Sequence, residues 1–107
     1  MEYRLVITTC PDMAVAEALA ASLVGERLAA CVNILPGARS IYEWQGRIEQ
    51  DEECVLLIKS RSDRLAQLEE RLLEQHPYEL PELIAVPIEE GLGPYFSWIN
   101  TQLDKKE

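Results

Sequence analysis

The stretch AACVNILPGARSIYEWQGRIEQDEECVLLIKS, residues 29–60, decides the fold. It predicts two long strands joined by a tight turn at Gln45-Gly46, because Gly tolerates the positive φ that two-residue hairpin turns need. One parity of the second strand is apolar, with the two-residue period of a strand, and it carries Ile48, Cys54, Leu56 and Ile58. In this register Trp44 faces Arg47 across the two strands.

The hairpin is expected to extend beyond the helices that cover it. About fourteen strand residues at ~3.3 Å each span about 46 Å, whereas a helix of about 14 residues at ~1.5 Å each spans about 21 Å. The overhanging part carries a group of large apolar side chains, which are Ile41, Tyr42, Trp44 and Ile48. A monomer rarely exposes so much apolar surface in one place. We therefore predict that the hairpin is an oligomerisation element; the alternative is an exposed arm with tolerated surface aromatics.

Composition narrows the class of protein. A chain of 107 residues predicts one domain, spanning residues 1–107. The net charge of −9 argues against nucleic acid and anionic membranes as partners, because both require a basic face. No apolar run reaches the roughly 18 residues of a membrane span, and no signal peptide is visible. Cys10, Cys31 and Cys54 are an odd number without metal-knuckle spacing, which predicts reduced thiols in a cytoplasmic protein.

The rest of the chain alternates strands and helices. The predicted elements are a strand at 3–9, a helix at 13–25, a strand at 28–34 that Leu35-Pro36-Gly37 interrupts before it resumes at 40, a helix that starts at 60–63 and ends near 75, a strand at 83–88, and a helix from Pro94. This order predicts an α+β, ferredoxin-like βαββαβ sandwich with a long central hairpin and an extra C-terminal helix. Two helices would cover one face of the sheet, and the C-terminal helix and another subunit would cover the other.

Two of these elements have specific signals. Leu5, Val6 and Ile7 are consecutive, which predicts that the first strand is central and covered on both faces. Ser60 and Asp63 have the spacing of a capping box at the start of the second helix. The buried stripe of that helix is predicted to be Leu65, Leu68 and Leu72.

Cys10 and His76 are the candidate soft-metal ligands. Cys10 lies where the first strand meets the first helix, and a helix N-terminus can lower a thiol pKa; the alternative is an inert packed thiol. His76 closes the second helix before Pro77, where a protonated imidazole is favoured by the helix dipole, whereas neutral imidazole would suit copper or zinc. Cys31 and Cys54 lie on strands and are predicted to be small apolar core residues.

Other polar groups gather near the ends of elements. A cleft between subunits could be lined by Lys59, Tyr78, Glu79 and Trp98. The acidic run of Glu49, Asp51, Glu52 and Glu53 is either a solvated strand edge or a weak site for a hard cation. Because the chain has a single histidine, we expect neither a Ser/His/Asp set nor a His₂ or His₃ metal site within one chain, and no Walker or Rossmann glycine loop is present. We therefore expect a protein that is not an enzyme.

The sequence resembles the CutA divalent-cation-tolerance family over nearly its whole length. The motifs that carry the resemblance are Ala29-Ala30-Cys31-Val32-Asn33-Ile34, Pro36-Gly37, Ser40-Ile41-Tyr42, Trp44, Gly46, Leu57-Ile58-Lys59, His76-Pro77-Tyr78-Glu79, Pro81-Glu82, Tyr95, Trp98 and Ile99. The resemblance implies a ferredoxin-like subunit in an interlocked homotrimer, with each hairpin tip packed on a neighbour. It also implies a cytoplasmic protein linked to tolerance of copper and other divalent cations.

The resemblance also bears on the site. Some bacterial members of the family that bind copper carry a Cys near the end of the first strand and a His-His pair before Pro-Tyr. Here His76 matches the second His, Gln75 stands at the first, and Thr8 stands at the Cys position. Cys10 lies two residues further along the strand, on the same face, and is the candidate substitute. The trimer is similar in architecture to the PII signalling proteins, which implies a second hypothesis: a signalling module with a small-molecule or protein ligand between subunits.

Overall fold

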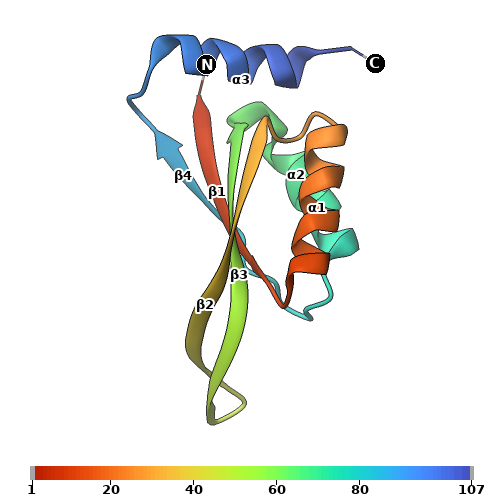
Figure 1. Ribbon diagram of the computed structural model, residues 1–107, viewed down its shortest axis with the longest axis vertical. Helices are drawn as coiled ribbons and strands as arrows, with labels where there is room; N and C mark the ends of the chain where they lie inside the picture. Colours follow the sequence, from red (N-terminus) through yellow and green to blue (C-terminus); the bar gives the residue numbers. More distant parts are fainter. Residues whose placement is uncertain (1, 107) are drawn as a thin grey trace.

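The computed structural model describes residues 2–106, which form a four-stranded antiparallel sheet and three helices. In chain order the elements are β1 (Tyr3–Cys10), α1 (Met13–Gly25), β2 (Cys31–Trp44), β3 (Arg47–Arg61), a 3₁₀ turn (Ser62–Arg64), α2 (Leu65–Gln75), β4 (Ile84–Ile88) and α3 (Gly93–Asp104). The strand order is β2-β3-β1-β4, so β1 is central as predicted (Figure 1). The predicted ferredoxin-like fold with a long hairpin and an extra helix is confirmed.

The β2–β3 hairpin projects below the rest of the molecule in Figure 1. Trp44 pairs with Arg47 as expected, and Gln45 and Gly46 form the turn with φ of 51° and 80°. The predicted interruption at residues 35–37 is confirmed in the ladder, where the register shifts between Leu35 and Ala38, although β2 continues through it as one strand. A bulge accommodates a proline, which has no N–H to donate, without ending the strand.

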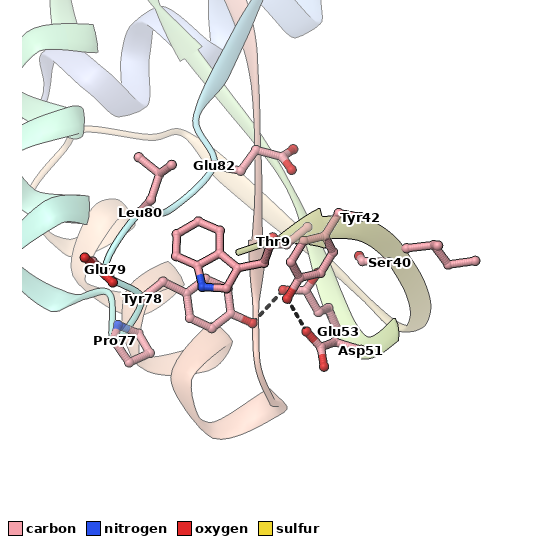
Figure 2. Close-up of a pocket in the computed structure, with 12 residues that line it drawn as sticks. Thr9, Ser40, Tyr42, Asp51, Glu53, Pro77, Tyr78, Glu79, Leu80 and Glu82 are labelled. Carbon is pink, nitrogen blue, oxygen red and sulfur yellow. Dashed lines mark hydrogen bonds between the residues drawn. The ribbon is translucent and has the colours of Figure 1, made fainter. Parts of the chain in front are cut away.

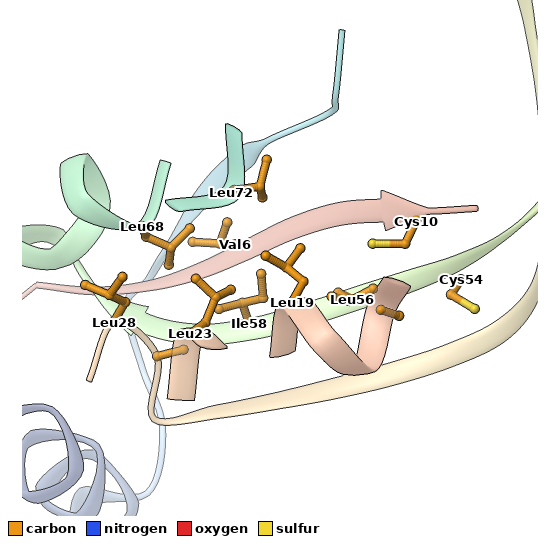
Figure 3. Close-up of a cluster of buried hydrophobic side chains, with 12 residues drawn as sticks. Val6, Cys10, Leu19, Leu23, Leu28, Cys54, Leu56, Ile58, Leu68 and Leu72 are labelled. Carbon is orange, nitrogen blue, oxygen red and sulfur yellow. The ribbon is translucent and has the colours of Figure 1, made fainter. Parts of the chain in front are cut away.

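The main core lies between the sheet and the helices α1 and α2 (Figure 3). It contains Val6, Cys10, Ala16, Leu19, Leu23, Leu28, Ala29, Cys54, Leu56, Ile58, Leu68 and Leu72. The apolar parity of β3 points into this core only from Cys54 onward. Cys54 is a buried core residue as predicted, whereas Cys31 is only half-buried.

The predicted capping box at the start of α2 is wrong. β3 continues to Arg61, and α2 begins at Leu65 after the 3₁₀ turn, without a side-chain cap. Ser60 instead donates from its hydroxyl to the carbonyl of Leu28 at 2.7 Å. Asp63 binds the buried Arg61 guanidinium at 2.6 Å, because a buried cation needs a paired carboxylate more than a helix end needs a cap.

α3 covers only one end of the second sheet face (Figure 1). Ile99 and Leu103 are buried against Ala30, and Phe96 stacks on Tyr3 with ring centroids 4.4 Å apart. The remainder of that face alternates with the core residues and is only partly covered in one chain. It carries Leu5, Ile7, Val55, Leu57, Ile84 and Val86. Among residues 2–106, no helix is long and apolar enough to cross a membrane.

Candidate functional site

The fold brings the two predicted soft ligands together. Cys10 ends β1 and His76 follows the last residue of α2, 66 positions later in the chain. Their side chains meet where Cys10 pairs with Cys54 of β3, with Cys10 Sγ 3.9 Å from His76 Nε2. Cys10 is fully buried and His76 is 8% exposed, so the pair is largely shielded from water.

Both nitrogens of the His76 ring are engaged. Nε2 lies 2.7 Å from the carbonyl of Thr9, and Nδ1 accepts from the backbone N–H of Tyr78 at 3.2 Å. A carbonyl can only accept, so Nε2 is the donor in its contact with Thr9. His76 ends the helix as expected, but through its backbone N–H to Leu72, and its ring binds β1 and not the last carbonyls of α2.

The Cys10 thiol is not activated. Burial, followed by the neighbouring Cys54, Glu53 and Asp12, raises the pKa of Cys10 to about 11. The structure therefore favours the inert packed thiol, one of the two interpretations of Cys10 from the sequence, over a thiol activated by the start of α1. Asp12 already caps that helix, accepting from the N–H of Val15 at 2.9 Å, and it adds a negative charge close to the sulfur. The thiol is therefore protonated near neutral pH.

Thr8 and Gln75, at the two other positions where the resemblance implies metal ligands in relatives, have partners of their own. The Thr8 hydroxyl donates to the carbonyl of Glu82 at 2.6 Å, and the Gln75 amide donates to the Ser22 hydroxyl at 2.9 Å. Within residues 2–106, no three His, Cys, Asp or Glu side chains are grouped to hold one metal ion. One chain thus offers two adjacent soft donors, both engaged, and does not complete a four-ligand site.

A larger feature lies beside this pair: a cavity of about 700 Å³ between the hairpin and the segment that follows α2 (Figure 2). We call it the hairpin pocket. Its lining residues are Thr9, Ser40, Ile41, Tyr42, Trp44, Asp51, Glu53, Pro77, Tyr78, Glu79, Leu80 and Glu82.

Only two of the four predicted cleft residues, Tyr78 and Glu79, line this pocket. Lys59 instead donates to the side chain of Asn33 on the second sheet face. Trp98 stacks on Tyr95 of α3, with ring centroids 5.6 Å apart. Of the predicted oligomerisation residues, Ile41, Tyr42 and Trp44 line the pocket and Ile48 does not.

Two tyrosine hydroxyls bind carboxylates in this pocket (Figure 2). Tyr78 donates to Glu53 at 2.5 Å, and Tyr42 donates to Asp51. The hydrogen bond to Asp51 is the main cause that raises the pKa of Tyr42 to about 12, and burial, then Glu53, raises the pKa of Tyr78 above its ordinary value. Both tyrosine hydroxyls therefore remain protonated near neutral pH and act as donors.

The interpretation of the acidic run as a solvated edge is wrong for Glu53, which is only 7% exposed. Strand periodicity did predict that Asp51 and Glu53 would share a face apart from Glu52. No local signal indicated that the face would be covered, because the cover comes from Tyr78, 25 residues later in the chain.

Comparison with known proteins identifies relatives over nearly the whole chain. The family model for the CutA1 divalent ion tolerance protein matches residues 4–102. A divalent-cation tolerance protein CutA from Yersinia pestis (strain Pestoides F) is 46% identical over 99 residues, which cover 92% of this chain and 83% of the relative.

Solved structures of CutA proteins have the same fold. The structure of CutA from Xylella fastidiosa is 49% identical with a TM-score of 0.94, over 97% of this chain and 100% of that one. The divalent cation tolerance protein (Cut A1) from Thermus thermophilus is 47% identical with a TM-score of 0.88, over 90% and 93% of the two chains.

Proposed function

Because this chain belongs to the CutA1 divalent ion tolerance family, we propose that it acts in the tolerance of, or response to, divalent cations, copper among them, as a cytoplasmic homotrimer. The family is named for tolerance and not for a reaction, and we propose no catalytic role. The three cysteines, all free, support a reducing compartment.

Two uncovered apolar surfaces support the trimer. The second sheet face keeps Leu57 and Ile7 at its centre with no helix over them, and the hairpin exposes Ile41 and Ile48. An apolar sheet face must be covered by another layer, and a second copy of the same chain can provide that layer. Three copies around an axis also supply three sets of donors.

The proximity of Cys10 and His76 is the single observation that carries a direct metal role. It places a thiol and an imidazole, the donors that copper and zinc prefer, 3.9 Å apart. Binding must displace the thiol proton and break the contact of His76 with Thr9, so one chain alone is expected to bind weakly. Donors from a neighbouring subunit would complete the coordination.

The test is a Cu²⁺ titration against a competing chelator, with the mass in solution recorded on the same sample. His76→Ala is expected to weaken binding while the trimer persists. Zn²⁺ is titrated in parallel, because it is not redox-active and does not oxidise thiols. One ion per chain would locate the site within a subunit, whereas one ion per three chains would locate it on the symmetry axis.

Cys31→Ser is the matched control, because it removes a half-buried thiol outside the Cys10–His76 pair. An equal loss in Cys31→Ser and His76→Ala, or an unchanged affinity in His76→Ala, would remove His76 from the site. Weak uptake that does not saturate in the wild-type protein would contradict a direct metal role.

The hairpin pocket favours a second candidate function, a PII-like signalling or binding module with a small-molecule or protein ligand. The cavity of about 700 Å³ is within the usual size range of ligand sites, and Tyr78 and Glu79 line it. A ligand that binds only the folded protein must raise its unfolding midpoint, so a thermal-shift screen of metabolites tests this candidate.

A further inference from the structure

The walls of the hairpin pocket combine aromatic rings with carboxylates. Tyr42, Trp44 and Tyr78 supply the rings, and no Lys or Arg is among the lining residues. The carboxylates come from Asp51, Glu53, Glu79 and Glu82. In Figure 2 the last two approach from the segment after α2 and the first two from β3, with the tyrosine rings between them.

These carboxylates have no cationic partner in the described chain. Every ion pair found within residues 2–106 uses another acid: Glu2, Glu26, Asp63, Glu74 or Asp104. Glu53 is the one buried acid of the four, at 7% exposed, and within residues 2–106 its side chain has a single hydrogen bond, from the hydroxyl of Tyr78. Largely buried acids in proteins are usually paired with a cation, and none of the described residues supplies one in this pocket.

The arrangement does not suit a bare metal ion. A hard cation needs several oxygens at about 2.0–2.6 Å, and no three acidic, His or Cys side chains among residues 2–106 are grouped closely enough. Separated carboxylates suit a larger cation that donates hydrogen bonds in several directions. Aromatic faces attract such a cation further when it lies within about 6 Å of the ring centre.

We propose that the hairpin pocket binds an organic cation, an ammonium or guanidinium group on a short carbon chain, held by Glu53 and Glu82 and flanked by Tyr42, Trp44 and Tyr78. The inference rests on the second candidate function and names its class of ligand. The cation supplies the positively charged partner that Glu53 lacks, and the carbon chain of the ligand lies against the rings.

Trp44 provides a direct readout of this site. The chain has two tryptophans, so Trp98→Phe leaves Trp44 as the only one. This protein is titrated with 1,4-diaminobutane and, separately, with the neutral 1,4-butanediol, by fluorescence and by calorimetry. We expect a saturable change at one diamine per chain and none with the diol.

Glu53→Gln tests the charge. The amide oxygen can still accept from Tyr78, so the variant removes the charge and keeps that hydrogen bond. Diamine affinity is expected to fall by about tenfold or more, the loss of one charged hydrogen bond. Glu82→Gln, at an exposed position, is the second variant if Glu53→Gln fails to fold, and the same loss is expected.

Glu69→Gln is the matched control, because it makes the same charge change at an exposed position of α2, outside the pocket. It is expected to bind diamine like the parent protein. Equal losses of diamine affinity in Glu69→Gln and Glu53→Gln would show that diamine is attracted by the overall net charge of −9 and not by the pocket, which would overturn the proposal. Saturation of the same signal by Mg²⁺ at lower concentration than by diamine would also overturn it.

The cation can come from solution or from a second copy of the chain, where Arg39 and Arg47 are exposed on the hairpin. Saturable diamine binding identifies a free amine. A second outcome is that diamine does not bind, but Glu53→Gln lowers the mass in solution and Arg39→Gln or Arg47→Gln lowers it as well. In that case the cation is the neighbour's arginine. If none of these occurs, the proposal fails; a neutral or anionic ligand that shifts Trp44 would then leave the second candidate function standing without this class of ligand.

Discussion

The two halves of β3 belong to one strand and have opposite environments. From Cys54 to Ser60, alternate side chains are buried beneath α1 and α2, whereas Ile48, on the same parity, is 68% exposed. The ladder to β2 continues through both halves, with Trp44 paired to Arg47 at the far end. Backbone pairing therefore extends to the tip of the hairpin, but apolar burial ends where the helices end. The comparison shows that backbone pairing is sufficient to extend the strand, whereas burial of apolar side chains stabilises only its covered half.

Leu68→Ala attacks the covered half and should have the largest effect on unfolding. Leu68 is fully buried on α2 over the sheet, so its truncation leaves a cavity and should lower the free energy of unfolding by about 2–5 kcal/mol. Urea denaturation measures the loss. Leu73→Ala, at an exposed leucine of the same helix, should change it by less than about 0.5 kcal/mol. Similar losses in the two variants would mean that α2 packs through another face.

At the end of the sheet opposite the hairpin tip, ion pairs connect α3 to β3. Removing one of them should lower the stability less than Leu68→Ala does. The buried Arg61 guanidinium binds Asp63 and Asp104 at 2.6 and 2.8 Å and so ties α3 to β3. It also lowers the pKa of both carboxyls below their ordinary 3.8. A lowered folded-state pKa stabilises the protein above that ordinary value, and the stabilisation is lost as pH falls through the lowered one.

Asp104→Asn should therefore reduce stability at neutral pH and weaken the dependence of stability on pH below 3.8. Unfolding midpoints between pH 7 and pH 2 measure both effects. Glu69→Gln, which alters an exposed carboxylate outside the ion pairs of residues 2–106, should retain the wild-type profile. A wild-type acid profile in Asp104→Asn would show that Arg61 does not use this partner in solution.

Trp44→Ala attacks the uncovered half and should have the smallest effect on the subunit itself. Trp44 is 40% exposed in one chain, so we expect the dissociated subunit to keep its stability within about 0.5 kcal/mol. The proposed trimer, in contrast, should weaken, which mass in solution at several protein concentrations will measure. Trp98→Ala is matched in exposure, at 40%, and lies on α3. An unchanged mass and an unchanged denaturation midpoint in Trp44→Ala would contradict the role of the hairpin in assembly.

Strand and helix order was predictable because its signals are local. The period of two in β3, the turn at Gln45-Gly46 and the leucine stripe of α2 each lie within a few residues, and each prediction is confirmed. The failures are also instructive. Ser60 and Asp63 have the spacing of a capping box. Ser60 instead donates to the Leu28 carbonyl, and Asp63 pairs with the buried guanidinium of Arg61.

The candidate sites were predictable only in part. Cys10 and His76 could be selected by residue type, since each stands at the end of an element, but their metal role stays a prediction. The raised pKa of Cys10 was not predictable, because it depends on burial and on charges brought from β3. The hairpin pocket was missed as a unit, because its residues were distributed between an oligomerisation group, a cleft group and an acidic run.

Local pattern was sufficient for the elements, their order and the overhanging hairpin, because periodicity and turn preference act between near neighbours in the chain. Long-range packing set the ring contacts of His76, the raised pKa of the Cys10 thiol and the burial of Glu53. Each depends on a partner far away in the chain: Thr9 lies 67 residues from His76, and Tyr78 lies 25 residues from Glu53. Burial and hydrogen bonding at a site come from the segments that meet there, and only the folded chain determines which segments those are.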